Sequence, residues 1–349
     1  MPATPAPTPA PEPATANDPV PSSPLHDLMY GHIDTCALRA VVVHGIPDHL
    51  ADGPLTAKQL AARSGTQAGP LHRVLRLLAQ RGLFRQHEDG AFCLTDSGQA
   101  LRADVPGSQR AAVLLFSGEA FRRSAAGVGD TLRTGQPGLD AAYGLPFFAY
   151  VSSVPDRSHL FDAAMSSLTS GANEKIVDSC PFPDSGTVVD VAGGRGGLLR
   201  EVLTRHTGLE GVLFDTPEAV TGHLLDTPEL KGRWSTRGGD LFAAVPEGGD
   251  VYLLKNILHD FSDEDCARVL GTLRRAVTPG TRLLVIDAVL PEDGAPPPAI
   301  ALDVVMLMTL RGRERTATDF EKLLGRCGFR LDRILPTPSL TSIVEATAV

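Results

Sequence analysis

The feature that most constrains the fold is a short apolar run that ends in a cluster of glycines and is followed by a helical pattern. Residues 187–203 read TVVDVAGGRGGLLREVL, and four of the seven residues after Asp190 are glycine. Glycine lacks a Cβ, so the backbone amides of such a turn can approach a ligand closely, and the amides at a helix start attract polar or anionic groups. The segment predicts a buried strand, a ligand-binding turn and a helix that begins near Leu198.

Apolar runs and helical patterns alternate from this point to the C-terminus. Predicted strands lie at 187–192, 211–216, 251–258 and 282–290, and predicted helices lie at 198–206, 263–277 and 318–327. Buried strands separated by amphipathic helices are typical of a mostly parallel sheet covered on both faces. The last two segments, 329–337 and 340–349, are predicted to close the sheet as an antiparallel pair. The sequence therefore predicts an α/β fold.

The second predicted strand ends in an acidic residue, Asp215, which follows Asp190 by 25 residues. An acidic side chain at about this distance from a glycine-rich turn can accept hydrogen bonds from ribose hydroxyls. The dinucleotide fingerprint GxGxxG is incomplete, because Leu199 takes its third glycine position when Gly194 and Gly196 fill the first two. A nucleoside without a pyrophosphate therefore fits better than a dinucleotide. The alternative is a tight turn that needs glycine only for its geometry.

The chain before the sheet divides into three parts by composition and pattern. Residues 1–24 are mostly Pro, Ala, Thr and Ser and predict a disordered tail. Residues 25–105 predict helices followed by two short strands that turn at Asp89-Gly90, which is a winged-helix pattern. Such a module binds DNA or packs against protein, and the net charge of −9 favours packing or dimerisation over a nucleic-acid partner.

Residues 106–180 predict a helical connector between this module and the sheet domain at 181–349. Phe147, Phe148 and Met165 lie in the connector and are predicted to line a small-molecule pocket, since clefts tend to form between domains. The alternative for these side chains is ordinary core packing.

Cysteine usage and hydropathy exclude several classes of protein. The five cysteines lie far apart without disulfide or metal-ligand spacing, so no metal site is predicted. No apolar stretch reaches the roughly 18 residues of a membrane-spanning helix, and the N-terminus lacks a signal-peptide pattern. We therefore expect a cytoplasmic protein without a membrane partner.

Four motifs of the second half resemble those of the O-methyltransferases of plant phenolic metabolism and bacterial natural-product pathways. They are DVAGGRGG at 190–197, LFDTP at 213–217, GDLF at 239–242 and LLKNILHDFSDEDC at 253–266. The resemblance covers nearly the whole chain after the tail. It implies a Rossmann-like sheet that binds S-adenosylmethionine and releases S-adenosylhomocysteine, together with an N-terminal winged-helix dimerisation domain. It further implies a homodimer that methylates a hydroxyl of a small aromatic or polyketide-type molecule.

The resemblance also implies roles for individual residues. The cofactor-binding positions are Asp190, Gly193, Gly194, Asp215, Asp240, Leu241 and Lys255. His259 would be the general base that removes the hydroxyl proton, bracketed by Asp287 and Glu314. The segment 161–169 resembles the helix over the cofactor, which would put Met165 against the substrate.

The proposed base must work against a difference in acidity. A phenol of pKa about 10 facing an imidazole of pKa about 6.5 is not deprotonated fully before reaction. We therefore expect proton removal to be concerted with methyl transfer, unless a conjugated carbonyl acidifies the hydroxyl. An acidic partner behind the imidazole would fix its tautomer and stabilise the imidazolium.

Three positions depart from the pattern of that family. Ala192 stands where the first glycine of the loop is usual, which matters little if its backbone keeps an ordinary conformation. Asp287 stands where plant members often carry Glu, so its reach to His259 is shorter. Phe261 replaces a common Trp, and nothing is inferred from it.

The residues alone leave structural interpretations open. His259 could be a buried structural histidine, Asp287 a turn cap, and Glu314 a surface ion pair with its arginine neighbours. Asp260 and Asp263 are predicted to be helix caps rather than catalysts. Ser262 with Asp265 is predicted to cap the helix that follows.

Other functions also remain open. The same fold is compatible with methylation of nitrogen or carbon, or with hydroxylation or cyclisation, although the histidine with its two acids argues against the latter two. A winged-helix regulator with a ligand-sensing domain and a nicotinamide oxidoreductase are weaker alternatives.

Overall fold

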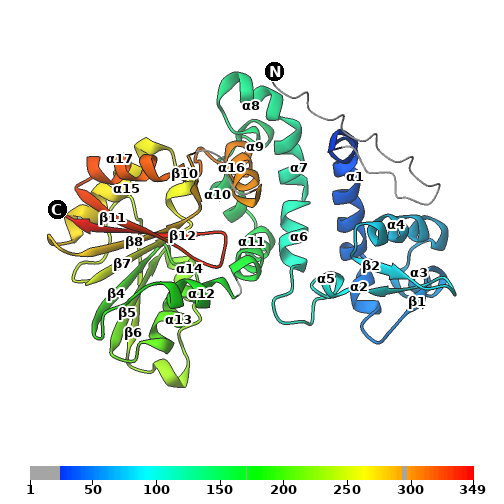
Figure 1. The fold of residues 1–349 in the computed structure, drawn as a ribbon, viewed down its shortest axis with the longest axis horizontal. Coiled ribbons are helices and arrows are strands. Elements are labelled where there is room, and N and C mark those ends of the chain that lie inside the picture. Colours follow the sequence, from blue (N-terminus) through cyan, green and yellow to red (C-terminus); the bar gives the residue numbers. More distant parts are fainter. Residues whose placement is uncertain (1–23, 170, 293–296) are drawn as a thin grey trace, which may run out of the picture.

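The computed structural model describes residues 24–169, 171–292 and 297–349. A helical N-terminal part and a sheet-containing C-terminal part lie at opposite ends of the molecule, and central helices join them (Figure 1). The predicted tail at 1–24 lies outside the described residues except for Pro24, which begins the first helix.

The N-terminal part combines helices with a small antiparallel sheet. Its helices are α1 (Pro24–Val43), α2 (Ile46–His49), α3 (Ala57–Ser64), α4 (Ala68–Gln80) and α5 (Asp96–Gln99), and its strands are β1 (Leu55–Thr56), β2 (Phe84–Gln86) and β3 (Ala91–Leu94). α3 begins with a capping box, in which the Thr56 hydroxyl accepts the Gln59 N–H and the Gln59 side chain accepts the Thr56 N–H. β2 and β3 pair antiparallel around Asp89-Gly90, as predicted.

Short helices form the connector, as the pattern of 106–180 predicted. They are α6 (Arg110–Phe116), α7 (Glu119–Ala126), α8 (Val128–Thr134), α9 (Gly138–Tyr143), α10 (Phe147–Ser152), α11 (Pro155–Thr169) and α12 (Ala172–Ser179). A later helix, α16 (Pro297–Thr309), packs against α7, α8 and α9. Buried aromatic residues, among them Phe121 and Phe147, hold this group together.

The C-terminal part is built on a mixed sheet. Among the described residues it has seven strands in the order β11-β12-β8-β7-β4-β5-β6. Their bounds are β4 (Gly186–Val191), β5 (Leu209–Asp215), β6 (Trp234–Gly238), β7 (Val251–Lys255), β8 (Arg282–Asp287), β11 (Phe329–Pro336) and β12 (Ser342–Ala348). The strands from β6 to β8 run parallel, whereas β12 pairs antiparallel with both β8 and β11. The predicted parallel sheet and its closing antiparallel pair are confirmed.

Helices cover both faces of this sheet, because successive strand residues point to opposite sides. α12 and α13 (Gly197–Arg205) pack on one face, and α15 (Asp263–Ala276) and α17 (Ala317–Arg326) pack on the other. The smaller elements are α14 (Pro217–Thr221), the two 3-10 turns η1 (Pro228–Leu230) and η2 (Leu258–Asp260), and the paired strands β9 (Val289–Leu290) and β10 (Arg315–Thr316).

The strand order places a reversal at the centre of the sheet. From β4 the chain moves outward to β5 and β6, and it then returns to β7 on the other side of β4. Loops at the carboxyl ends of the strands diverge at such a reversal and leave a crevice in which ligands bind. The glycine turn after β4 and the residues after β7 meet at this edge.

Candidate active site

The glycine turn between β4 and α13 allows close approach of its backbone. A Cβ on Gly193 would lie 2.5 Å from the carboxyl carbon of Asp190, so a side chain cannot be accommodated there. Gly194 and Gly196 have φ angles of 59° and 76°, a conformation that favours glycine. Nothing lies within 4 Å of the position that a Cβ on Gly194 would take. The turn therefore presents bare backbone to open space.

Ala192 has a strained backbone conformation at the start of this turn. Its φ is 55°, so the condition under which alanine would matter little at this position is not met. The left-handed region brings the Cβ of an L-residue too close to the following carbonyl oxygen, at a cost of roughly 1–2 kcal/mol. The turn geometry imposed by the neighbouring glycines extends to a position that carries a side chain.

Asp215 ends β5 and is hydrogen-bonded to the glycine turn. Its Oδ2 accepts the backbone N–H of Gly194 at 2.7 Å, and its Oδ1 accepts the N–H of Thr216 at 2.7 Å. Burial raises the pKa of this carboxyl, and the two N–H donors oppose the rise. The carboxylate and the turn therefore form one unit at the carboxyl edge of the sheet.

Asp190 and Lys255 lie on the neighbouring strands β4 and β7. Burial raises the pKa of Asp190 to about 7 against the opposing charge of Lys255, and burial lowers the pKa of Lys255 to about 8 against the charge of Asp190. Oδ2 of Asp190 is buried without a hydrogen-bond partner among the described residues. The Lys255 ammonium donates to Oδ1 of Asn173 in α12 at 2.7 Å.

Asp240 and Leu241 follow β6, next along the same edge. The Asp240 carboxylate is exposed, and its Oδ1 accepts the N–H of Phe242 at 2.9 Å. Leu241 is half-buried. The N–H of Gly239 donates to the carbonyl of Asp215 at 2.9 Å, which ties this loop to the end of β5.

These residues fit an adenosylmethionine by their chemistry. An acidic side chain at the end of β5 suits ribose hydroxyls, the open side of Gly194 leaves room for a ligand against the backbone, and the unpartnered oxygen of Asp190 suits a hydrogen-bond donor. All of them lie at the crevice set by the strand order.

His259 lies in the η2 turn, immediately after β7. Its Nδ1 is 2.8 Å from Oε1 of Glu314, and its Nε2 is 3.4 Å from Oδ1 of Asp260. The imidazole is buried, with 8% of the residue exposed, and the Glu314 side chain is fully buried. A carboxylate only accepts hydrogen bonds, so Nδ1 carries the hydrogen in this pair and Nε2 is the nitrogen left for another partner.

Three carboxyl groups surround this imidazole. Burial alone would lower the pKa of His259, but the hydrogen bond that its ring donates to Glu314 and the charges of Asp260 and Asp287 together raise it to about 10. Burial raises the pKa of Asp260 to about 7 and that of Asp287 to about 6, in each case against the opposing charge of His259. Both oxygens of Asp287 and Oε2 of Glu314 are buried without hydrogen-bond partners among the described residues.

The sequence-based cap assignments hold for one residue pair and fail for two residues. Ser262 caps α15 by accepting the N–H of Asp265, as predicted. Asp260 is not a cap, because it lies beside the imidazole of His259. Asp263 is not a cap either, since its carboxylate pairs with Arg315 at 2.7 Å and with Arg313 at 3.2 Å.

The connector residues predicted to line a pocket lie in different surroundings. Phe147 is buried in the aromatic cluster, where its ring contacts those of Phe121, Phe148 and Phe161. Phe148 is 41% exposed, and Met165 on α11 is half-buried. Phe147 is therefore a core residue at this position, whereas the other two have free surface.

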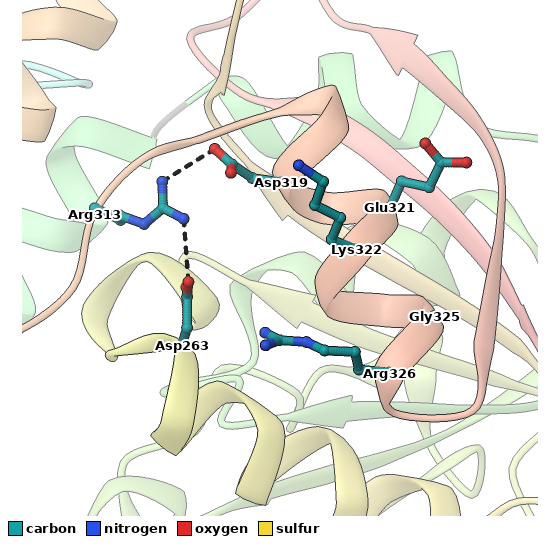
Figure 2. Close-up of a pocket in the computed structure, with 7 residues that line it drawn as sticks. All are labelled: Asp263, Arg313, Asp319, Glu321, Lys322, Gly325 and Arg326. Carbon is teal, nitrogen blue, oxygen red and sulfur yellow. Dashed lines mark hydrogen bonds and ion pairs between the residues drawn. The ribbon is translucent and has the colours of Figure 1, made fainter.

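A pocket on the outer face of the sheet domain has no relation to this site. It lies between the start of α15 and α17, and Arg313 crosses its wall to pair with Asp263 and with Asp319 at 3.0 Å (Figure 2). Lys322 and Arg326 line the side of α17 (Figure 2).

Metal-binding clusters and membrane-spanning helices are absent from the parts of the chain that the structure describes. No group of three or more His, Cys, Asp or Glu side chains there could hold a metal ion. None of the described helices is long and apolar enough to cross a membrane.

Comparison with protein families gives two matches. Residues 126–330 match the O-methyltransferase domain, and residues 26–104 match the O-methyltransferase dimerisation domain. The chain belongs to the O-methyltransferase family. It is an S-adenosylmethionine-dependent O-methyltransferase of the type found in bacterial natural-product pathways.

Individual relatives agree with this assignment over nearly their whole length. The chain is 37% identical to the O-demethylpuromycin-O-methyltransferase of Streptomyces alboniger, over 92% of this chain and 88% of the relative. It is 36% identical to the phenazine O-methyltransferase PhzM of Lysobacter antibioticus, over 94% and 96%. The crystal structure of CalO1, a methyltransferase in calicheamicin biosynthesis in its SAH-bound form, superposes with a TM-score of 0.84 at 40% identity, covering 93% of this chain and 97% of that chain. Other relatives are named as N-methyltransferases, among them a phenazine-1-carboxylate N-methyltransferase of Pseudomonas aeruginosa at 33% identity, over 86% of this chain and 90% of the relative.

The structure adds residues to the site that sequence reasoning missed. Asn173 contacts Lys255, and Asp260 lies against His259. Asp303 on α16 accepts the backbone N–H of Glu314 at 2.8 Å. A signal for Asp303 was present, because it is the only charged residue in the apolar sequence of α16, PPAIALDVVMLMT.

Proposed function

We propose that this enzyme transfers a methyl group to a hydroxyl of a small aromatic or polyketide-type natural product, with His259 as the general base. The observation that carries the proposal is that the two nitrogens of the imidazole have different surroundings. Nδ1 is occupied by Glu314 at 2.8 Å, which leaves Nε2 to take a proton at the edge of the sheet where the glycine turn lies.

Binding and orientation are assigned to the carboxyl ends of β4, β5, β6 and β7. Asp215 would hold the ribose, Asp240 and Leu241 the base, and the turn at 193–194 together with Asp190 and Lys255 the methionine part. Bound S-adenosylmethionine supplies an electrophilic methyl group on a sulfonium. Holding two reactants in line contributes about 7–11 kcal/mol toward such a reaction.

Proton removal is assigned to Nε2 of His259. In the neutral imidazole, the Glu314 carboxylate fixes the hydrogen on Nδ1 and so leaves the lone pair on Nε2. As the substrate hydroxyl attacks, its proton moves to Nε2, and the resulting imidazolium is stabilised by Glu314 and by the charges of Asp260 and Asp287. These acids have positioning and electrostatic roles in the proposal.

His259 can act as a base only when its imidazole is neutral. The surrounding carboxyl groups raise the pKa of His259 to about 10, so the cofactor-free enzyme holds the imidazole protonated at neutral pH. The pKa of His259 would be lower with a sulfonium bound nearby, because a like charge disfavours the charged form. His259 would therefore lose its proton more readily in the cofactor complex than in the free enzyme.

The aromatic class of the substrate is supported by the connector. Phe148 has free surface next to Phe161, and Met165 lies on the same helix as Phe161. Flat aromatic molecules stack well on such side chains. Phe147 packs against the ring of Phe161 and is buried, so its proposed role is to support Phe161 and not to contact the substrate.

Transfer to nitrogen is the second candidate, because relatives over 30% identical are named as N-methyltransferases. An aromatic amine also loses a proton on methylation, so the same base serves both acceptors. A panel that pairs each phenol with its matching aniline separates the two.

A homodimer is proposed on the surface of α1. This helix exposes Leu28, Met29 and Ile33 at 80%, 58% and 43%, and it lies in the region that matches the dimerisation domain. An exposed apolar surface of this kind on a soluble domain marks a protein interface. Light scattering should give twice the chain mass, and a monomer at all concentrations would contradict this proposal.

The experiment is mass spectrometry of methyl transfer from isotope-labelled cofactor to a panel of phenols, anilines, quinols and polyketide aromatics. We expect a labelled O-methyl product from at least one phenol, and labelling at least about 100-fold slower with His259→Ala. Label only on nitrogen would favour the second candidate, and equal labelling by the variant would overturn the role of His259.

A further inference from the structure

We propose that Asp303 is a positioning residue that holds Glu314 against the imidazole of His259, an inference that rests on the proposed base role of His259. Oδ1 of Asp303 accepts the backbone N–H of Glu314 at 2.8 Å. Oε1 of the same Glu314 lies 2.8 Å from Nδ1 of His259. Glu314 therefore connects α16 to the imidazole, through its backbone on one side and its carboxylate on the other.

The place of Asp303 in α16 points to a specific task. The other residues of this helix are Pro, Ala, Ile, Leu, Val, Met and Thr, so the carboxylate departs from an otherwise apolar pattern. Its partner is a main-chain amide in the loop after the helix, not a cation. A charged acceptor on a main-chain N–H makes a stronger hydrogen bond than a neutral one. The contact is therefore well suited to hold the Glu314 backbone in one position.

Other contacts also hold the loop that carries Glu314 on the His259 turn. A Cβ on Gly312 would clash with the carbonyl oxygen of His259, so the loop backbone lies directly on that turn. Arg315 donates to the carbonyl of Leu258 at 2.7 Å and to the carbonyl of Phe261 at 3.1 Å. None of these contacts involves the amide of Glu314. Asp303 thus holds the backbone of the loop residue whose carboxylate is hydrogen-bonded to the imidazole.

Loss of Asp303 should therefore act through the Nδ1 contact. The freed N–H of Glu314 would turn toward another acceptor and carry the side chain away from Nδ1. The hydrogen bond that His259 donates to Glu314 raises the pKa of His259, so its loss should lower that pKa, while the charges of Asp260 and Asp287 remain. The tautomer of the ring would also lose its restraint.

A double-mutant cycle tests this path. Asp303→Ala should lower kcat about tenfold, as loss of an outer hydrogen-bond partner does, and move the rising limb of the pH–rate profile to lower pH. Asp303→Asn keeps an oxygen acceptor and should restore most of kcat. In a Glu314→Ala background, Asp303→Ala should have no further effect, because the partner through which it acts is already absent.

Asp140→Ala is the matched control, since Asp140 pairs with Arg311 of the same loop at 3.2 Å without touching Glu314. It should leave the pH–rate profile unchanged. Calorimetric cofactor binding reports whether each variant is folded. Additive losses in the cycle, or an Asp303→Asn variant as impaired as Asp303→Ala, would overturn the inference. An active His259→Ala variant would instead overturn the proposed function on which it rests.

Discussion

Asp215 and Asp287 show two different environments for a carboxyl group in the candidate site. Both oxygens of Asp215, in the half of the site proposed to bind the cofactor, accept backbone N–H groups. In the catalytic half, both oxygens of Asp287 and one oxygen of Glu314 are buried without partners among the described residues, as is one oxygen of Asp190 beside the glycine turn. An acid that accepts main-chain N–H groups keeps a fixed position, whereas unpartnered acids around an imidazole increase its affinity for a proton. Asp215 is thus placed for binding, and the acids around His259 are placed to support proton transfer.

The largest effect should come from the catalytic half alone. His259→Ala should lower kcat by at least about 100-fold, the lower range for loss of a general base, because it removes the nitrogen proposed to take the hydroxyl proton. The cofactor dissociation constant should stay the same. Steady-state kinetics and calorimetry measure the two quantities. His44→Ala, an exposed histidine at the end of α1, is the control and should match wild type.

The next effect should come from the binding half alone. Asp215→Ala removes the acceptor proposed for the ribose hydroxyls, and a hydrogen bond to a charged group contributes about 1.5–3 kcal/mol, so the cofactor dissociation constant should rise by about tenfold or more. At saturating cofactor, kcat should recover. Glu210→Ala on the exposed face of β5 is the control for the strand. Unchanged affinity in a folded Asp215→Ala variant would remove the distinction between the halves.

The pH dependence tests how the halves are coupled. Because His259 must lose a proton to act as a base and its pKa is raised to about 10 in the free enzyme, activity should rise with pH from neutrality toward that value. The profile of kcat, measured with cofactor bound, should rise at lower pH than the profile of kcat/KM for the cofactor, since the sulfonium lowers the pKa. Two coincident profiles would show that the cofactor leaves the imidazole unchanged.

The smallest effect is expected at the turn itself. Ala192→Gly relieves a φ of 55° but makes the unfolded chain more flexible, so the net gain in unfolding free energy should be about 1 kcal/mol. Chemical denaturation monitored by fluorescence gives this value. A loss of stability would mean that the Ala192 side chain contributes more by packing than it loses by strain.

The fold and the cofactor side could be predicted because their signals are local. The run from Val188 through Gly197 lies within one strand, turn and helix, and Asp215 ends the next strand. The order of strands and helices then brings the glycine turn and Asp215 to the same edge of the sheet. The backbone of Ala192 could not be predicted, because its conformation follows from how the whole turn closes.

The catalytic side was harder because its parts are distant in sequence. Asp260 is an acidic residue shortly before a helix, and this position predicted a helix cap. Its contact with the imidazole of His259 depends on the conformation of the folded turn. Asp303 contacts Glu314 across a loop whose course no periodic pattern describes. The family resemblance supplied Asp287 and Glu314, but it did not indicate that Asp287 would be buried with both oxygens unpartnered.

The most direct test of the account is a crystal structure with S-adenosylhomocysteine and a phenolic acceptor. We predict that the ribose lies on Asp215, that the glycine turn holds the amino-acid part, and that the acceptor oxygen lies within hydrogen-bond distance of Nε2 of His259. An imidazole that faces away from the acceptor, or a ribose bound away from the end of β5, would contradict it.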